Sequence, residues 1–124
     1  MAITINATSI MVGTDEIEVV GTLAISGNYT SGTGDTVNFN SLQGVSTKNG
    51  RVFAVAGDAQ PDFVSINPVQ GYNLEYQLGT NLSNGVMRLF NAAGTEQNTG
   101  AYPAVITGDA NIFFCATFPK LIPA

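Results

Sequence analysis

The side chains of this chain that could do chemistry are few. Among its 124 residues there is no histidine, a single cysteine, and nine aspartates and glutamates in total. The lack of histidine excludes a Ser-His or Cys-His nucleophilic site and a histidine-based metal site. The one thiol, Cys115, lies in an apolar stretch. A small core residue is expected there, because a nucleophilic cysteine requires an accessible, electropositive setting.

Paired carboxylates are the remaining candidates for catalysis. General acid and base work of the kind that glycosidases perform could use one of two pairs, Asp58 with Asp62 or Glu16 with Glu18. Both pairs lie beside expected turns or strand edges, where a solvated carboxylate needs no function. Calcium could bind at Asp15 and Glu16, or at loop oxygens near Asp58, but no EF-hand spacing is present. We therefore predict that the protein is not an enzyme and carries no metal or cofactor.

The four tyrosines could form a platform on which sugars stack. Three of them, Tyr29, Tyr72 and Tyr76, fall on the apolar phase of expected strands. Since buried aromatic rings contribute strongly to a core, we expect packing and not sugar binding from these three residues.

Composition indicates one globular domain with an unusually uncharged surface. Hydrophobic residues make up 44% of the chain and charged residues 10%, whereas about 25% charged residues is typical. A chain of this length can bury about two thirds of its unfolded surface and so fold as one unit. Its surface must be covered largely by Asn, Thr, Ser and Gly, which suits a protein held among neighbours.

The distribution of charge excludes several partners. The net charge is −5, and the basic residues do not cluster: they are Lys48, Arg51, Arg88 and Lys120. Phosphate backbones and anionic lipid surfaces attract runs of Lys and Arg, so we expect no direct nucleic-acid partner and no membrane partner. The start of the chain has no basic region followed by an apolar run, so we expect no signal peptide. A lone cysteine is consistent with assembly in a reducing cytoplasm.

The longest expected element is a strand from Ile17 to Thr30. Apolar residues alternate with polar or small ones over this stretch, as in a strand with one face on a core. The apolar residues occupy odd positions: Ile17, Val19, Leu23, Ile25 and Tyr29. Gly21 and Gly27 lie on the same face, which predicts a bulge, a bend or the close approach of another sheet.

Shorter strands are expected to complete the structure. We predict a hairpin between residues 17–30 and 37–39, and an antiparallel pair between 72–78 and 86–90. Further strands are predicted at 51–56, 63–66 and 110–118, with 102–107 joined to the last one by a tight turn at Gly108-Asp109. No window has helical periodicity. The fold class is therefore all-β: an antiparallel β-sandwich, a jelly-roll-like fold or a small barrel, in a single domain.

The two ends of the chain are expected to lie outside the core. We predict an N-terminal arm at residues 1–16, a β domain at 17–118 and a C-terminal tail at 119–124. Within the arm, residues 2–6 are expected to be either a short alternating strand or extended chain. Extended segments with apolar side chains can add to a sheet edge of a neighbour. The residues expected to contact a partner are Ile3, Ile5, Ile10, Val12, Leu121 and Ile122. On this interpretation, deletion of residues 2–12 leaves the domain folded.

Three stretches together resemble a known family. They are GTLAISGNYTSGTGDTVNFNSL (21–42), PDFVSINPVQGYNLEYQLGTNLSNGVMRLFNAAG (61–94) and AYPAVITGDANIFFCATFPK (101–120). They are similar to head decoration, or cement, proteins of tailed bacteriophages, which are usually encoded beside the major capsid protein. The resemblance implies a β-rich domain, commonly a homotrimer, seated outside the shell at threefold or quasi-threefold positions. It covers strands and turns, so it assigns no role to an individual residue.

The leading hypothesis is a non-enzymatic cement protein on the exterior of a virion head, assembled in the host cytoplasm. Its partners would be the major capsid protein and two sister subunits. Two alternatives remain open. One is a phage tail or fibre component that adsorbs to the host, and the other is a carbohydrate-binding module, which requires an exposed row of aromatic side chains with calcium nearby.

Overall fold

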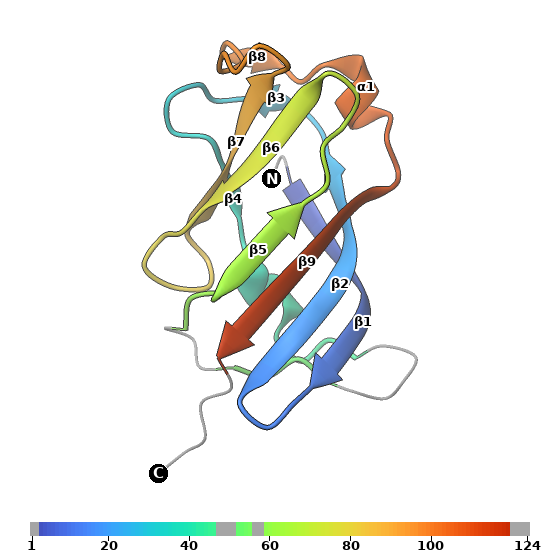
Figure 1. The fold of residues 1–124 in the computed structure, drawn as a ribbon, viewed down its shortest axis with the longest axis vertical. Coiled ribbons are helices and arrows are strands. Elements are labelled where there is room, and N and C mark those ends of the chain that lie inside the picture. Colours follow the sequence, from blue (N-terminus) through green and yellow to red (C-terminus); the bar gives the residue numbers. More distant parts are fainter. Residues whose placement is uncertain (1–2, 47–51, 56–58, 120–124) are drawn as a thin grey trace.

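The computed structural model describes residues 3–46, 52–55 and 59–119. Over these residues the chain is mainly antiparallel β-structure (Figure 1). The predicted all-β class is therefore confirmed. One sheet has the order β1-β2-β9-β5, with bounds Ile3–Val12, Glu16–Ile25, Ile112–Pro119 and Phe63–Ile66. A second sheet has the order β4-β7-β6, with bounds Asp35–Val37, Gly85–Asn91 and Tyr72–Gln77. A small ribbon pairs β3 (Asn28–Tyr29) with β8 (Gly100–Ala101). The helical turns are η1 (Phe39–Leu42) and α1 (Ala104–Thr107).

The two larger sheets share one hydrophobic core. Side chains such as Leu23 and Phe114 of the first sheet belong to the same buried cluster as Leu74 and Leu89 of the second. The ring of Phe39, on η1, lies within this cluster, 5.1 Å from the ring of Phe118 and 6.0 Å from that of Phe114. No closed barrel forms among the described residues, so a sandwich-like arrangement is the predicted architecture that the structure supports.

The predicted long strand is confirmed in its position and its buried face, but it ends earlier than expected. Its apolar odd-numbered residues are all buried. Gly27 has φ +75°, a conformation that turns the chain, so β2 ends at Ile25 and the short strand β3 follows. The predicted hairpin with residues 37–39 is wrong, since β2 pairs with β1 and β9, and β4 pairs with β7.

Gly21 lies beside a bulge, one of the features that its position on the apolar face predicted, and the main chain that approaches it belongs to β1 of the same sheet. A Cβ atom at Gly21 would collide with the main chain of Asn6 and Ala7. The register of β1 against β2 shifts at the same place, between Ala7 and Ser9. The missing side chain therefore allows the bulged part of β1 to lie against β2.

The structure corrects the expectation of a separate N-terminal arm. Residues 3–12 form β1, the edge strand of the larger sheet, and are part of the β domain. The bulge explains why this was difficult to predict: apolar residues occupy odd positions before it, at Ile3 and Ile5, and even positions after it, at Ile10 and Val12. Because the alternation changes phase, the sequence looks irregular although one face remains buried.

Two further predicted strands are wrong. Residues 102–107 do not form one: after Tyr102 the fixed φ of Pro103 leads into the helical turn α1, in which the Ile106 N–H donates to the Pro103 carbonyl (2.9 Å). The strand predicted at 51–56 is reduced, within its described residues, to one isolated bridge between Val52 and Ser46. By contrast, β5 and the β6–β7 pair lie where they were predicted.

Adjacent substitutions in β1 test its role in the core. The side chain of Ile10 is 0% exposed and that of Met11 is 58% exposed. Ile10→Ala is expected to lower the free energy of unfolding by about 2–5 kcal/mol, because it removes buried methyl groups and leaves a cavity. Met11→Ala is expected to change it by less than about 0.5 kcal/mol. Urea unfolding measures both; similar values for the two variants would show that β1 is not packed as described.

Candidate functional site

The densest group of ionisable side chains surrounds Glu96, which follows β7. The Glu96 carboxylate accepts hydrogen bonds from Arg88 Nη2 (2.8 Å) and Nε (3.0 Å). It also accepts from the Tyr29 hydroxyl (2.7 Å) and from the Gly32 N–H (2.8 Å). The hydrogen bonds from Arg88 are the main reason that the pKa of Glu96 falls to about 2, and the Tyr29 hydroxyl adds to this effect.

These groups satisfy one another, which indicates a structural role. The Tyr29 hydroxyl also accepts from the Leu89 N–H (3.0 Å), and the Tyr29 ring meets that of Tyr102 edge-on at 5.6 Å. The Tyr102 hydroxyl in turn donates to the carboxylate of Asp35. Burial and this carboxylate raise the pKa of Tyr102 far above its usual range. These hydrogen bonds join β3, β4 and β7 to one another and to the loop that carries Glu96.

Sequence reasoning did not identify this cluster. Tyr29 was predicted to be a core residue, and it is, but its partner Glu96 is 67 positions away. The one signal was Arg88, a charged residue inside the otherwise apolar stretch Val86–Phe90. A charge in such a position needs a partner, although the sequence does not say which carboxylate supplies it.

Of the two carboxylate pairs considered from the sequence, only Glu16 with Glu18 lies wholly within the described residues. Asp62 is exposed, and Asp58 lies outside the described residues. Glu16 and Glu18 lie at the start of β2, where Glu16 is exposed and Glu18 is half-buried. Within residues 3–46, 52–55 and 59–119, no three His, Cys, Asp or Glu side chains are grouped so that they could hold a metal ion.

Cys115 lies half-buried on the outer side of β9. Burial raises the pKa of its thiol, and the negative charge of Glu18 raises it further. Both effects reduce the thiolate fraction, so the side chain is a poor nucleophile.

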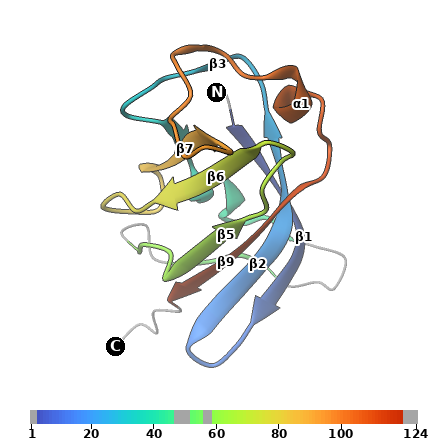
Figure 2. The same ribbon diagram turned by 45° about the horizontal axis from the view of Figure 1, so that its top comes forward.

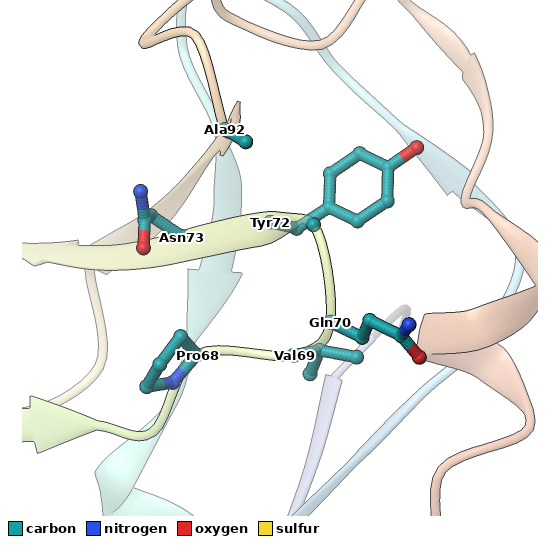
Figure 3. A pocket seen from close by; sticks show the side chains of 7 residues that line it. Pro68, Val69, Gln70, Tyr72, Asn73 and Ala92 are labelled. Atoms are coloured by element: carbon teal, nitrogen blue, oxygen red, sulfur yellow. The ribbon is translucent and has the colours of Figure 1, made fainter.

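One surface pocket of about 370 Å³ surrounds the turn between β5 and β6. Figure 3 shows that Pro68 and Asn73 point to one side of the turn, whereas Gln70 and the Tyr72 ring point to the other. The lining contains no charged residue; it consists of Pro68, Val69, Gln70, Gly71, Tyr72, Asn73 and Ala92. The pocket therefore has no convergent polar groups of the kind that orient a substrate.

The outer face of the four-stranded sheet carries exposed apolar side chains. Phe63, Phe113 and Met11 are 57%, 48% and 58% exposed. The register places them on one face, with Phe63 opposite Thr117, Phe113 opposite Thr22 and Met11 opposite Glu18. Cross-strand neighbours share a side of a sheet, and the opposite side carries the core. We call this side, from β1 across β2 and β9 to β5, the outer face.

Charge is nearly absent from the outer face. Of the described strand residues on it, only Glu16 and Glu18 are charged, and both lie at one end of β2. The register sets these side chains apart, since Glu18 and Thr117 lie between Met11 and Phe63, so they do not form one continuous patch. Exposed aromatic residues on a weakly charged, regular surface nevertheless suit an interaction site. The sequence of β9 contains part of this signal, since Phe113 and Cys115 alternate with Ile112, Phe114 and Ala116. For Phe63 the sequence contains no such signal.

The residues predicted to contact a partner are placed as follows. Ile3 and Ile10 are 2% and 0% exposed within the chain's own core, so the expectation that they face a partner is corrected. Ile5 and Val12 are half-buried and pack against the same core. Leu121 and Ile122 lie outside the described residues. Among described residues, the outer face is thus a better candidate for contact than the inward side chains of β1.

Comparison of the chain with protein-family models, with curated proteins and with solved structures finds no match. Among the helical turns of the described residues, none has the length and apolar character needed to cross a membrane. The structure thus offers an interaction surface as its candidate functional site.

Two tyrosine variants test the polar cluster. Tyr29→Phe leaves the Leu89 N–H without its partner and removes one donor from Glu96, so a loss of about 1–3 kcal/mol in the free energy of unfolding is expected. Tyr76→Phe is the matched control, because the buried Tyr76 hydroxyl has no hydrogen-bond partner among the described residues. Its removal is expected to be neutral or stabilising. Urea unfolding measures both variants. A larger loss of unfolding free energy for Tyr76→Phe than for Tyr29→Phe would contradict the structural role of the Tyr29 hydroxyl.

Acid sensitivity tests Glu96 directly. The pKa of Glu96 is about 2 in the folded chain, against 4.5 for an unperturbed glutamate. A depressed carboxylate pKa stabilises the fold above the unfolded value and ceases to do so as pH falls toward the folded value. The wild type should therefore exceed Glu96→Gln in unfolding midpoint by the largest amount at neutral pH. This difference should shrink as the pH falls from 4.5 to about 2. A difference that does not depend on pH would refute the ion pair.

Proposed function

We propose that this chain is a non-enzymatic structural protein of a tailed-bacteriophage virion, a decoration or cement protein that binds the outside of the capsid and stabilises it as a homotrimer. The observation that carries the proposal is the exposed apolar outer face of the β1-β2-β9-β5 sheet. The resemblance of residues 21–42, 61–94 and 101–120 to head decoration proteins supports the choice of partner.

The outer face suits a broad and stable contact. A sheet presents a regular surface, and burial of aromatic side chains such as Phe63 and Phe113 contributes much of the binding energy at an interface. The scarcity of charge lowers the cost of removing water from this surface. A low charged fraction over the whole chain, 10%, also fits a protein that works among close neighbours.

Trimerisation explains how a small domain could remain attached. One copy of a 124-residue domain offers a limited contact area and would bind weakly by itself. Three joined copies make the second and third contacts intramolecular, at a high effective concentration, so avidity rises without any new kind of contact.

The alternative functions differ in what they require. A carbohydrate-binding module built on tyrosines would need these rings exposed in a row, but Tyr29 and Tyr102 are 0% and 5% exposed, and Tyr72 and Tyr76 are half-buried. A tail or fibre component would be present in few copies at one vertex, whereas a cement protein matches the copy number of the capsid lattice. Quantitative mass spectrometry of purified particles separates these two.

A binding assay tests the role of the outer face. Heads assembled from the major capsid protein of the same genome are incubated with the purified chain and sedimented. The wild type should sediment with the heads, and the double variant Phe63→Ser/Phe113→Ser should bind at least about tenfold more weakly, because two exposed aromatic anchors are lost. The matched control is Leu78→Ser, which removes a side chain that is 58% exposed, next to β6 and outside the outer face.

Three results would contradict the proposal: no binding of the wild type to heads, equal weakening by Leu78→Ser, or a monomer in analytical ultracentrifugation at concentrations where heads are saturated.

A further inference from the structure

A hollow of about 190 Å³ lies at the end of the large sheet where β1 turns into β2. Its lining consists of Met11, Val12, Gly13, Glu16 and Glu18. The hollow therefore combines apolar side chains, of which Met11 is 58% exposed, with two carboxylates. We call it the hairpin hollow.

The two carboxylates of the hairpin hollow have no basic partner among residues 3–46, 52–55 and 59–119. Within these ranges the one ion pair joins Arg88 of β7 to Glu96. Glu18 is half-buried, and a carboxylate in such a setting is more stable with a basic group nearby. The hairpin hollow is thus a site that favours a positively charged group beside an apolar one.

The register of the sheet indicates which part of the chain can supply these groups. The last residue of β9, Pro119, lies opposite Glu16. Figures 1 and 2 show that β9 ends at the same end of the sheet as the turn between β1 and β2. Beyond the described residues, Pro119 is followed by the sequence Lys120-Leu121-Ile122-Pro123-Ala124, in which one basic residue precedes two large apolar ones.

The length of this segment matches the distance to the hollow. Neighbouring strands lie about 4.8 Å apart, so a hollow that extends from β2 to β1 lies about 5–10 Å from Pro119. Extended chain advances about 3.3–3.6 Å per residue, which carries Leu121 and Ile122 about 7–10 Å from Pro119. Lys120 then lies beside Glu16, and the two apolar side chains lie beside Met11.

We propose that residues 120–124 dock in the hairpin hollow of their own chain, with Leu121 and Ile122 against Met11 and with Lys120 paired to the carboxylates. Docking covers an exposed apolar side chain and gives Glu16 and Glu18 a basic partner. The chain's own segment is favoured over that of a second copy, because its short connection to β9 gives it a high effective concentration at the hollow.

The docked segment would close one end of the outer face and leave the aromatic residues of that face exposed. Phe63 lies on β5 and Phe113 on β9, opposite Thr22, away from the turn between β1 and β2. The inference goes beyond the proposed function, since it concerns a contact within one chain and makes no assumption about virus particles.

The first test is methyl NMR on the full chain. Nuclear Overhauser effects are expected between the Met11 ε-methyl group and the methyl groups of Leu121 or Ile122, because these groups are in contact in the docked state. Their absence, or contacts of the Leu121 and Ile122 methyl groups with other residues only, would overturn the proposal.

A mixed sample of isotope-labelled and unlabelled chains separates docking within a chain from docking on a second copy. No Overhauser effect between the Met11 methyl group of one chain and the Ile122 methyl groups of another is expected. Such an effect would reject docking within the chain and assign the segment to a neighbouring copy.

Charge variants test the role of Lys120. Glu16→Gln/Glu18→Gln should lower the ratio of docked to free segment about two- to fivefold, the range expected for exposed ion pairs, and so weaken the Met11–Ile122 effect. The matched control is Asp62→Asn, which removes an exposed carboxylate at the start of β5 that does not line the hollow. No change in the double variant, or an equal change in Asp62→Asn, would reject the ion pair.

Disulfide trapping gives an independent measurement in a Cys115→Ser background. Oxidation should join Met11→Cys to Ile122→Cys at least about fivefold faster than it joins Phe63→Cys to Ile122→Cys. Phe63 is the stricter control because it pairs directly with Thr117 of β9, whereas Met11 is two strands away. A segment that does not dock would reach Phe63→Cys at least as fast, and that result would overturn the proposal.

Discussion

The pairing of β2 with β9 is the interaction on which the rest of the structure depends. These two central strands align from Glu16–Pro119 to Leu23–Ile112, and both send apolar side chains into the core at every second residue. Because β2 also pairs with β1, and β9 with β5, the four strands form a sheet whose inner side covers the second sheet. Removal of water from these inward side chains is the main source of stability.

This arrangement determines where function can reside. The core occupies one side of the large sheet, and the polar cluster around Glu96 is fully used in joining β3, β4 and β7. What remains are surfaces: the outer face, with Phe63 and Phe113 exposed, and the edge strands of the two sheets. A protein whose free features are an apolar face and unpaired strand edges is suited to binding other chains.

Local alternation made much of the fold predictable, and the failures have physical causes. The buried face of β2 and the β6–β7 pair follow from period-two patterns within single strands. The bulge in β1 changes the phase between Ile5 and Ile10, so an integral strand was interpreted as an arm. Sheet order and the Tyr29–Glu96 hydrogen bond depend on contacts between residues distant in sequence, which a local pattern does not contain.

The central proposal is that this chain binds a capsid through the outer face. A cryo-electron reconstruction of virus heads saturated with the chain tests this most directly. The account predicts density at threefold or quasi-threefold positions of the shell, with the β1-β2-β9-β5 sheet turned toward the capsid surface. Heads without added density, or density in which the outer face points to solvent and touches neither capsid nor sister subunit, would contradict it.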